Sequence, residues 1–189
     1  MDYYAATAAA GLLLQELGID CTGELGDTPH RMVRALTEMT SSLRDGFDPG
    51  VHLTRQFEAP PGGVPQLIVM KDITFTSVCE HHLLPFTGQA TVGYLPAPDA
   101  KVVGASKIPR LVTGLAAKPQ MQERLGQEVV DALGKHLDIQ GAACTIRGAH
   151  SCMTLRGPRA TGASMITNHL TGCFLDGQVR AEFLALSRP

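Results

Sequence analysis

The sequence predicts an α+β domain that has an antiparallel sheet, helices on one face of that sheet and an N-terminal helical segment. Helical spacing of apolar residues dominates the first forty residues and a second region after residue 105. Short alternating or continuous apolar runs lie between and after these regions, as is typical of strands. The resulting order of helices, strand pair, helix pair, strand pair and short helix favours segregated helices and strands.

The N-terminal third is predicted to be helical. A first helix covers about residues 4–17 and stops near Gly18, because glycine is a common stop signal. Thr28-Pro29 indicates an N-cap with proline in the first turn of a second helix. That helix has apolar residues at helical spacing: Met32, Val33, Leu36 and Met39. Residues 46–63 are rich in Gly, Pro and Asp and predict a connecting loop.

The remainder of the chain is predicted to alternate between strands and helices. The expected strands are residues 67–70, 73–75, 89–95, 142–155 and 165–175. The expected helices are residues 106–117 and 120–137, separated by Pro119, and a closing helix at 179–186. A chain of 189 residues suits one core rather than two independent domains. We therefore expect an N-terminal helical segment with its loop at 1–63, and a single sheet-containing unit at 64–189.

Composition excludes several classes of protein. The formal net charge is only −2, so no global field favours nucleic acid or an anionic membrane surface as a partner. No apolar run reaches the roughly 20 residues that span a bilayer. The Ala-rich residues 5–14 follow Asp2 rather than a basic segment, which favours an amphipathic helix over a signal peptide. Five cysteines are an odd number spread along the chain, which favours a reducing cytoplasm over a disulfide framework.

Two short clusters combine cysteine and histidine: Cys79-Glu80-His81-His82 and His150-Ser151-Cys152. Thiolate and neutral imidazole are ligands of tetrahedral zinc, and a catalytic site uses three protein ligands and leaves one position open. Cys79, His82 and Cys152 would form such a set, with His81 and His150 left as proton carriers. Alternation along the predicted strand would turn His150 and Cys152 to the same face.

Other interpretations of these clusters remain open. All five cysteines could be small buried hydrophobes, which we expect for Cys21, Cys144 and Cys173. His81 could be a surface residue and His150 a hydrogen-bonded core residue. The metal could also be structural rather than catalytic.

Basic residues outside the clusters could bind a phosphorylated substrate: Arg31, Arg34, Lys107, Arg110 and Arg156. Solvated surface residues are the alternative for each of them. Arg156 is the strongest candidate, because it follows Cys152 by four residues on the same predicted strand face. The chain has no Gly-rich phosphate-binding loop, so side chains would have to hold any nucleotide.

Four motifs in order along the chain resemble GTP cyclohydrolase I. They are SVCEHHLLPF at 77–86, GASKIPR at 104–110, PQMQERL at 119–125 and HSCMTLRG at 150–157. The resemblance extends from residue 28 to residue 184. It implies the tunnelling fold for 64–189, in which strands of several subunits close a barrel, and a homodecamer of two pentamers with active sites between subunits.

The resemblance also implies a reaction and a role for each site residue. Zn²⁺ bound by Cys79, His82 and Cys152 activates the water that attacks C8 of GTP, formate leaves, and rearrangement and cyclisation give 7,8-dihydroneopterin triphosphate. His81 and His150 pass protons, and Ser106 acts in the ribose rearrangement. Glu123, with Gln122, matches the position that recognises guanine. The five basic residues named above match the positions that bind the triphosphate.

The sequence departs from the family pattern at two places. Arg147 stands where family members usually have an acidic residue, and residues 165–169 replace a Thr/Ser-rich run. Neither departure affects a predicted zinc ligand or proton carrier. A specialised paralogue with a different product or purine substrate is therefore one alternative, and a non-catalytic ring-forming homologue is another.

Overall fold

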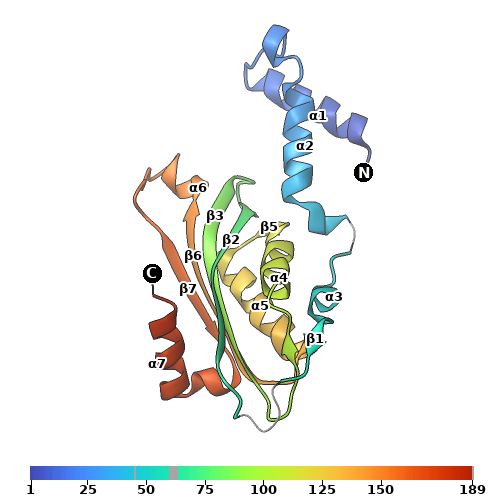
Figure 1. The fold of residues 1–189 in the computed structure, drawn as a ribbon. Coiled ribbons are helices and arrows are strands. Elements are labelled where there is room, and N and C mark those ends of the chain that lie inside the picture. Colours follow the sequence, from blue (N-terminus) through green and yellow to red (C-terminus); the bar gives the residue numbers. More distant parts are fainter. Residues whose placement is uncertain (45, 60–63, 189) are drawn as a thin grey trace.

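A five-stranded sheet forms the centre of the molecule (Figure 1). The structure, a computed structural model, describes residues 1–44, 46–59 and 64–188. The strand order is β5-β2-β3-β6-β7, and every pairing is antiparallel except that of β5 with β2. The strands are β2 (Ile68–Cys79), β3 (Pro85–Pro96), β5 (Pro119–Gln120), β6 (Ile139–His150) and β7 (Met165–Leu170). The predicted α+β class with an antiparallel sheet is confirmed.

Helices cover both faces of the sheet, so the prediction of helices on one face is wrong (Figure 1). On one face, α4 (Lys107–Ala116) and α5 (Gln122–His136) bury the larger core. On the other face, η3 (Gly172–Leu175) and α7 (Gly177–Leu186) form a second apolar cluster around Phe174 and Phe183. The reason is that the first half of β6 is apolar on both faces, since Ala142 and Cys144 belong to the first core and Ala143 to the second.

The N-terminal helices extend away from the sheet as a hairpin (Figure 1). It consists of α1 (Tyr3–Glu16), η1 (Gly23–Leu25) and α2 (Thr28–Met39), followed by η2 (Ser41–Leu43). Asp2 caps α1 by accepting hydrogen bonds from the backbone of Tyr4 and Ala5. Both helices were predicted, but Thr28 is already helical and Asp27 precedes it, so the predicted N-cap is one residue late.

The predicted loop at 46–63 contains regular structure, which is a correction. The α3 helix (Pro49–Leu53) is capped by Asp48 and buries Leu53 completely. The β1 strand (Gln56–Phe57) then pairs with β4 (Val102–Val103) in a separate two-stranded sheet. These elements are too short to produce a periodic pattern. Residues 60–63 of the predicted loop lie outside the described residues.

Four of the predicted strands have different limits in the structure. The segments 67–70 and 73–75 form one strand, β2, which is irregular between Met70 and Ile73. The segment 142–155 is a strand only as far as His150, after which the chain forms the short α6 helix (Ser151–Thr154). The segment 165–175 ends as a strand at Leu170. None of the helices in the described part of the chain has the length and apolar character that crossing a membrane requires.

Candidate metal centre and active site

The two cysteine and histidine clusters meet at one end of the sheet. Strands β2 and β6 both run antiparallel to β3, which lies between them, so β2 and β6 run in the same direction. Phe86 on β3 pairs with Ser77 on one side and with His150 on the other. The C-terminal ends of β2 and β6, which carry Cys79 and His150, therefore lie at the same end of the sheet.

Cys79, His82 and Cys152 form a group that could hold a metal ion. Their ligand atoms all lie within 4.8 Å of one another. The Sγ atom of Cys79 is 3.9 Å from the Sγ of Cys152 and 3.9 Å from Nδ1 of His82. Tetrahedral zinc with bonds of about 2.3 Å to sulfur requires two thiolates to be about 3.8 Å apart, so this donor set fits. Cys79 is buried, Cys152 half-buried and His82 exposed, which leaves one side of the group open.

Local turns, rather than strand alternation, bring these ligands together. After Cys79 the chain reverses: the Leu83 N–H donates to the Cys79 carbonyl at 2.8 Å, and the Cys79 N–H donates to the Leu84 carbonyl at 2.9 Å. Cys152 lies in the helical turn of α6 and not on the strand. The prediction that His150 and Cys152 share a strand face is therefore wrong, although both residues lie at the same end of the sheet.

Burial raises the pKa of the Cys152 thiol, and the neighbouring Cys79 thiol raises it further. Two thiols in contact resist double ionisation in the absence of a counter-charge. A divalent cation supplies that charge and stabilises both thiolates. The chemistry of the donor set thus favours a cation at this position.

The two candidate proton carriers have different environments. His81 is exposed, and its Nε2 lies 3.9 Å from a carboxylate oxygen of Glu80. The ring of His150 stacks on Phe86 with the centroids 4.3 Å apart and the planes only 5° from parallel. Burial lowers the pKa of His150, and the negative charge of Glu123 partly opposes this shift. His150 is therefore a neutral base at neutral pH.

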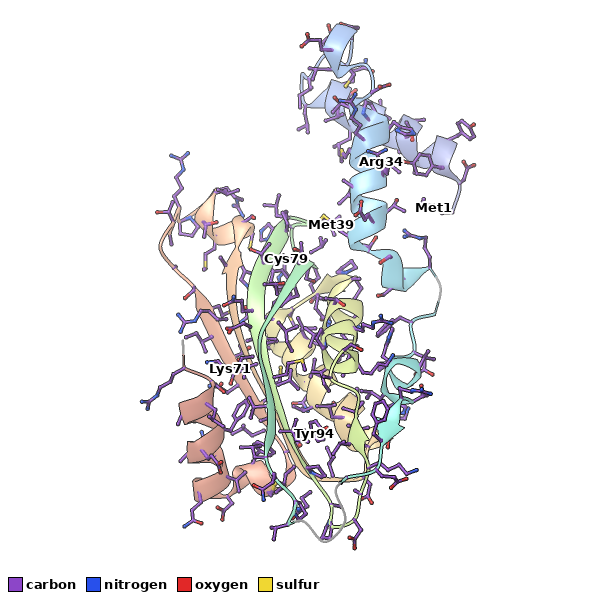
Figure 2. The ribbon with its side chains drawn as sticks, in the orientation of Figure 1. Met1, Arg34, Met39, Lys71, Cys79 and Tyr94 are labelled. Atoms are coloured by element: carbon purple, nitrogen blue, oxygen red, sulfur yellow. The ribbon has the colours of Figure 1, made fainter. Side chains whose placement is uncertain are left out.

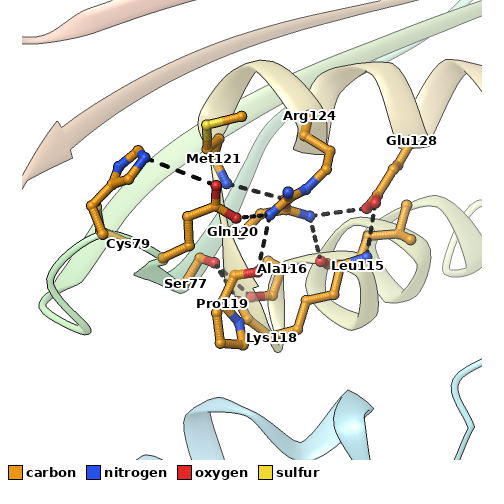
Figure 3. Close-up of polar contacts among 12 residues, drawn as sticks. Ser77, Cys79, Leu115, Ala116, Lys118, Pro119, Gln120, Met121, Arg124 and Glu128 are labelled. Carbon is orange, nitrogen blue, oxygen red and sulfur yellow. Dashed lines mark hydrogen bonds and ion pairs between the residues drawn. The ribbon is translucent and has the colours of Figure 1, made fainter.

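A polar network joins the turn that follows Cys79 to the start of α5 (Figure 3). The Arg124 guanidinium binds the Glu80 carboxylate and donates to Oε1 of Gln120 at 2.6 Å. The Glu80 N–H donates to the Gln120 carbonyl at 3.1 Å. Gln120 in turn donates to Glu128 at 2.9 Å, and Glu128 pairs with Lys118 at 2.8 Å. Sequence reasoning missed Glu80 and Arg124 as a pair, although each lies within a motif that resembles the family.

Three further predicted residues lie at this end of the molecule. The Nη1 atom of Arg156 is 3.1 Å from Nε2 of His82. Arg156 follows a helical turn, so its predicted position on a strand face is wrong. Glu123 is exposed in the first turn of α5, whereas the side chain of its neighbour Gln122 is completely buried.

The other predicted residues are not brought to the group of Cys79, His82 and Cys152 within one chain. The ten-residue α4 helix is about 15 Å long, and Ser77 near the cluster binds the carbonyl of Ala116 at the C-terminal end of that helix. Ser106 directly precedes the helix, and Lys107 and Arg110 lie in its N-terminal half. Arg31 and Arg34 lie on α2, and Figure 2 shows Arg34 beyond Met39, away from Cys79 and the sheet.

Comparison with known proteins identifies close relatives over nearly the whole chain. The protein-family model for GTP cyclohydrolase I matches residues 6–188. The GTP cyclohydrolase 1 of Rhodopirellula baltica is 39% identical over 188 residues, which cover 98% of this chain and 79% of that protein. The GTP cyclohydrolase 1 of Mycobacterium leprae is 42% identical over 187 residues, which cover 98% of this chain and 89% of that protein.

One solved structure has a weaker likeness. The crystal structure of the archaeosine synthase QueF-Like in the apo form gives a TM-score of 0.47 with 14% sequence identity. The match covers 58% of this chain and 97% of that one. A likeness at this level does not assign the fold.

Proposed function

Since the chain belongs to the GTP cyclohydrolase I family, whose members are hydrolases that act on GTP, we propose a zinc-dependent reaction at C8 of guanine. In this reaction formate is released, and rearrangement and cyclisation give 7,8-dihydroneopterin triphosphate, the first step toward folates and other pterins. The observation that carries the proposal is the open group of Cys79, His82 and Cys152 with two histidines beside it.

The two cysteines and the histidine are the ligands that we assign to zinc. Sulfur and nitrogen donors at this spacing suit zinc better than magnesium or calcium, which prefer oxygen. When bound, zinc supplies Lewis-acid chemistry that makes water nucleophilic near neutral pH. The exposure of His82 on one side of the group leaves room for a substrate to approach.

The remaining residues at this end of the sheet have roles that suit guanine chemistry. His150 is neutral and can accept a proton, and the exposed His81 can exchange protons with solvent. The Glu123 carboxylate can accept hydrogen bonds from N1 and the exocyclic amine of guanine. Arg156, next to His82, can bind a phosphate oxygen.

We further propose that a second copy of the chain completes the site. Ser106, Lys107 and Arg110 lie at the other end of α4, yet their motif resembles the ribose and triphosphate positions of the family. The outer edge of β7 and most of the outer edge of β2 have no strand partner among the described residues. Pairing of these edges between copies would support the tunnelling fold and a decamer of two pentamers.

An assay with GTP tests the reaction. Zinc-loaded protein should release formate and form a product that becomes a fluorescent pterin after oxidation. Cys152→Ser should lose both bound zinc and turnover, whereas the matched variant Cys21→Ser, in the N-terminal hairpin, should keep both. Retention of zinc and turnover by Cys152→Ser would refute the metal assignment.

Complementation tests whether the site lies between subunits. Cys152→Ser and Lys107→Ala should each be inactive alone. When the two are co-expressed, random mixing should leave about a quarter of the sites with both native residues. Activity of that order, in particles that light scattering shows to be decamers, is the expected result. No recovery in mixed particles would contradict a shared site.

Arg147 motivates the alternative of a specialised paralogue with another product. It lies on β6 between Ile146, which faces α5, and Gly148, so its side chain belongs to the opposite face of the sheet. Its charge therefore lies on the face of the sheet opposite to the α5 face, away from the site residues that this chain contributes. Formate release without a pterin product would favour the alternative.

A further inference from the structure

The Gln122 side chain is a fully buried amide beside His150. It has no exposed surface, and its Oε1 atom lies 3.1 Å from Nε2 of His150. Its Nε2 atom lies 3.2 Å from the Ile146 carbonyl and 3.1 Å from the Met165 carbonyl. A buried polar group with this many partners has one orientation that satisfies them.

The two carbonyl groups determine which way the amide faces. A backbone carbonyl can only accept a hydrogen bond, so the NH₂ group of Gln122 must point toward Ile146 and Met165. The amide oxygen then faces His150 and can only accept. Nε2 of His150 must therefore carry a proton, and the lone pair of the neutral ring is on Nδ1.

The surrounding residues fix the ring as well as its tautomer. Phe86 stacks on the imidazole and restricts rotation of the ring plane. A Cβ at Gly148 would collide with Oε1 of Gln122, so glycine at this position makes room for the amide. Nδ1 of His150 has no hydrogen-bond partner in the described part of the chain and is not buried. It is the ring nitrogen that remains accessible.

We propose that Gln122 is a positioning residue that holds His150 with Nε2 protonated and Nδ1 directed to the substrate. This deepens the proposed function and rests on it. Gln122 keeps its hydrogen bond whether His150 is neutral or has taken up a proton, because Nε2–H is present in both forms. Guanine recognition then falls to the exposed Glu123, since the Gln122 amide is already used within the chain.

Kinetics of a nearly isosteric variant test this role. Gln122→Met removes the amide and should lower kcat on the order of 100-fold, the effect of a misplaced general base, with KM for GTP and zinc content within about twofold of the parent. The control is Thr145→Val, which removes one side-chain hydrogen bond between β6 and β7, from Thr145 to Asn168. It should leave kcat near that of the parent. An increase in KM with unchanged kcat in Gln122→Met would overturn the proposal in favour of substrate contact.

The tautomer can be measured in the parent protein, even if Gln122→Met fails to fold. Nitrogen-15 spectra of histidine-labelled, zinc-loaded protein should show a protonated Nε2 and a bare Nδ1 for His150, assigned by the loss of its signals in His150→Asn. The opposite tautomer would refute the proposal. If the parent releases no formate from GTP, the proposed function fails, whereas the tautomer measurement still tests Gln122 independently.

Discussion

Gly126 and Gly134 both lie within α5, and the same change to alanine is expected to have different effects at the two positions. Apart from its chain neighbours and the backbone of its own helix, a Cβ at Gly134 would meet no heavy atom of the described residues within 4 Å. A Cβ at Gly126 would lie 2.8 Å from Nε2 and 3.1 Å from Cγ of His169 on β7. The pair of variants therefore separates helix propensity from the packing of α5 against β7.

Helix propensities and the cost of overpacking give the size of the expected change in the free energy of unfolding. Alanine is favoured over glycine by about 0.8–1 kcal/mol within a helix, so Gly134→Ala should raise the free energy of unfolding by that amount. Gly126→Ala has the same gain in helix propensity, but overpacking against His169 lowers the free energy of unfolding by about 1–3 kcal/mol. The two variants should differ by about 1–3 kcal/mol. For a chain of this length, each kcal/mol corresponds to a change in Tm of about 2–4 °C.

Thermal unfolding followed by circular dichroism measures the difference. The double variant Gly126→Ala/His169→Ser removes the ring and should recover most of the stability lost in Gly126→Ala. Displacement of β7 would also move the Met165 carbonyl that holds Gln122, so Gly126→Ala should lower turnover while Gly134→Ala does not. A Tm for Gly126→Ala equal to or above that of Gly134→Ala would refute the reasoning.

Two further predictions concern charged groups near the site. Burial lowers the pKa of His169 from 6.5, although Glu123 and Asp131 oppose the shift, so the unfolded chain binds a proton more readily than the folded one. Stability should therefore fall as the pH drops below about 6.5, and by less in His169→Asn, as urea unfolding at pH 7 and pH 5 would show. Arg124→Met should leave the Glu80 carboxylate without its partner and weaken zinc retention by about 1 kcal/mol, since both groups are partly exposed. Equal rates of zinc loss to a chelator in variant and parent would contradict this second prediction.

Local patterns were sufficient to predict the longer helices but not the short ones, α3 and α6, or the ends of the strands. Thr28-Pro29 marks the start of α2, and apolar spacing predicts α5 to within two residues at each end. Residues 142–155 contain no break at His150, so the sequence predicts a longer strand. The strand ends there because its partner β3 begins at Pro85, which leaves the residues after His150 without a strand to pair with.

The structure brings the predicted ligands Cys79, His82 and Cys152 together, but one of them arrives by a route other than the predicted one. Cys152 reaches the cluster from a helical turn, whereas sequence reasoning relied on strand alternation. The contact between Glu80 and Arg124 joins residues 44 positions apart, and no local pattern indicates such a pair. Burial of Gln122 likewise depends on β6 and β7 packing against α5, which is a tertiary effect. Short local motifs therefore supply the candidate ligands, and long-range packing determines which side chains hold them.

The first turn of α5 contacts both parts of the site that one chain contributes: the turn after Cys79 and the end of β6. These two parts are the halves of the site. Arg124 holds the carboxylate of Glu80 in the turn that carries Cys79, and Gln122 holds His150 at the end of β6. Other links between these halves are β3, the contact between the two thiols and the contact of Arg156 with His82. Because the two anchoring side chains leave the same helical turn, they keep the proposed metal ligands and the proposed proton carrier in a constant relation. Loss of Arg124 should act mainly on metal retention and loss of Gln122 mainly on proton transfer, so the two properties should be separable at this site.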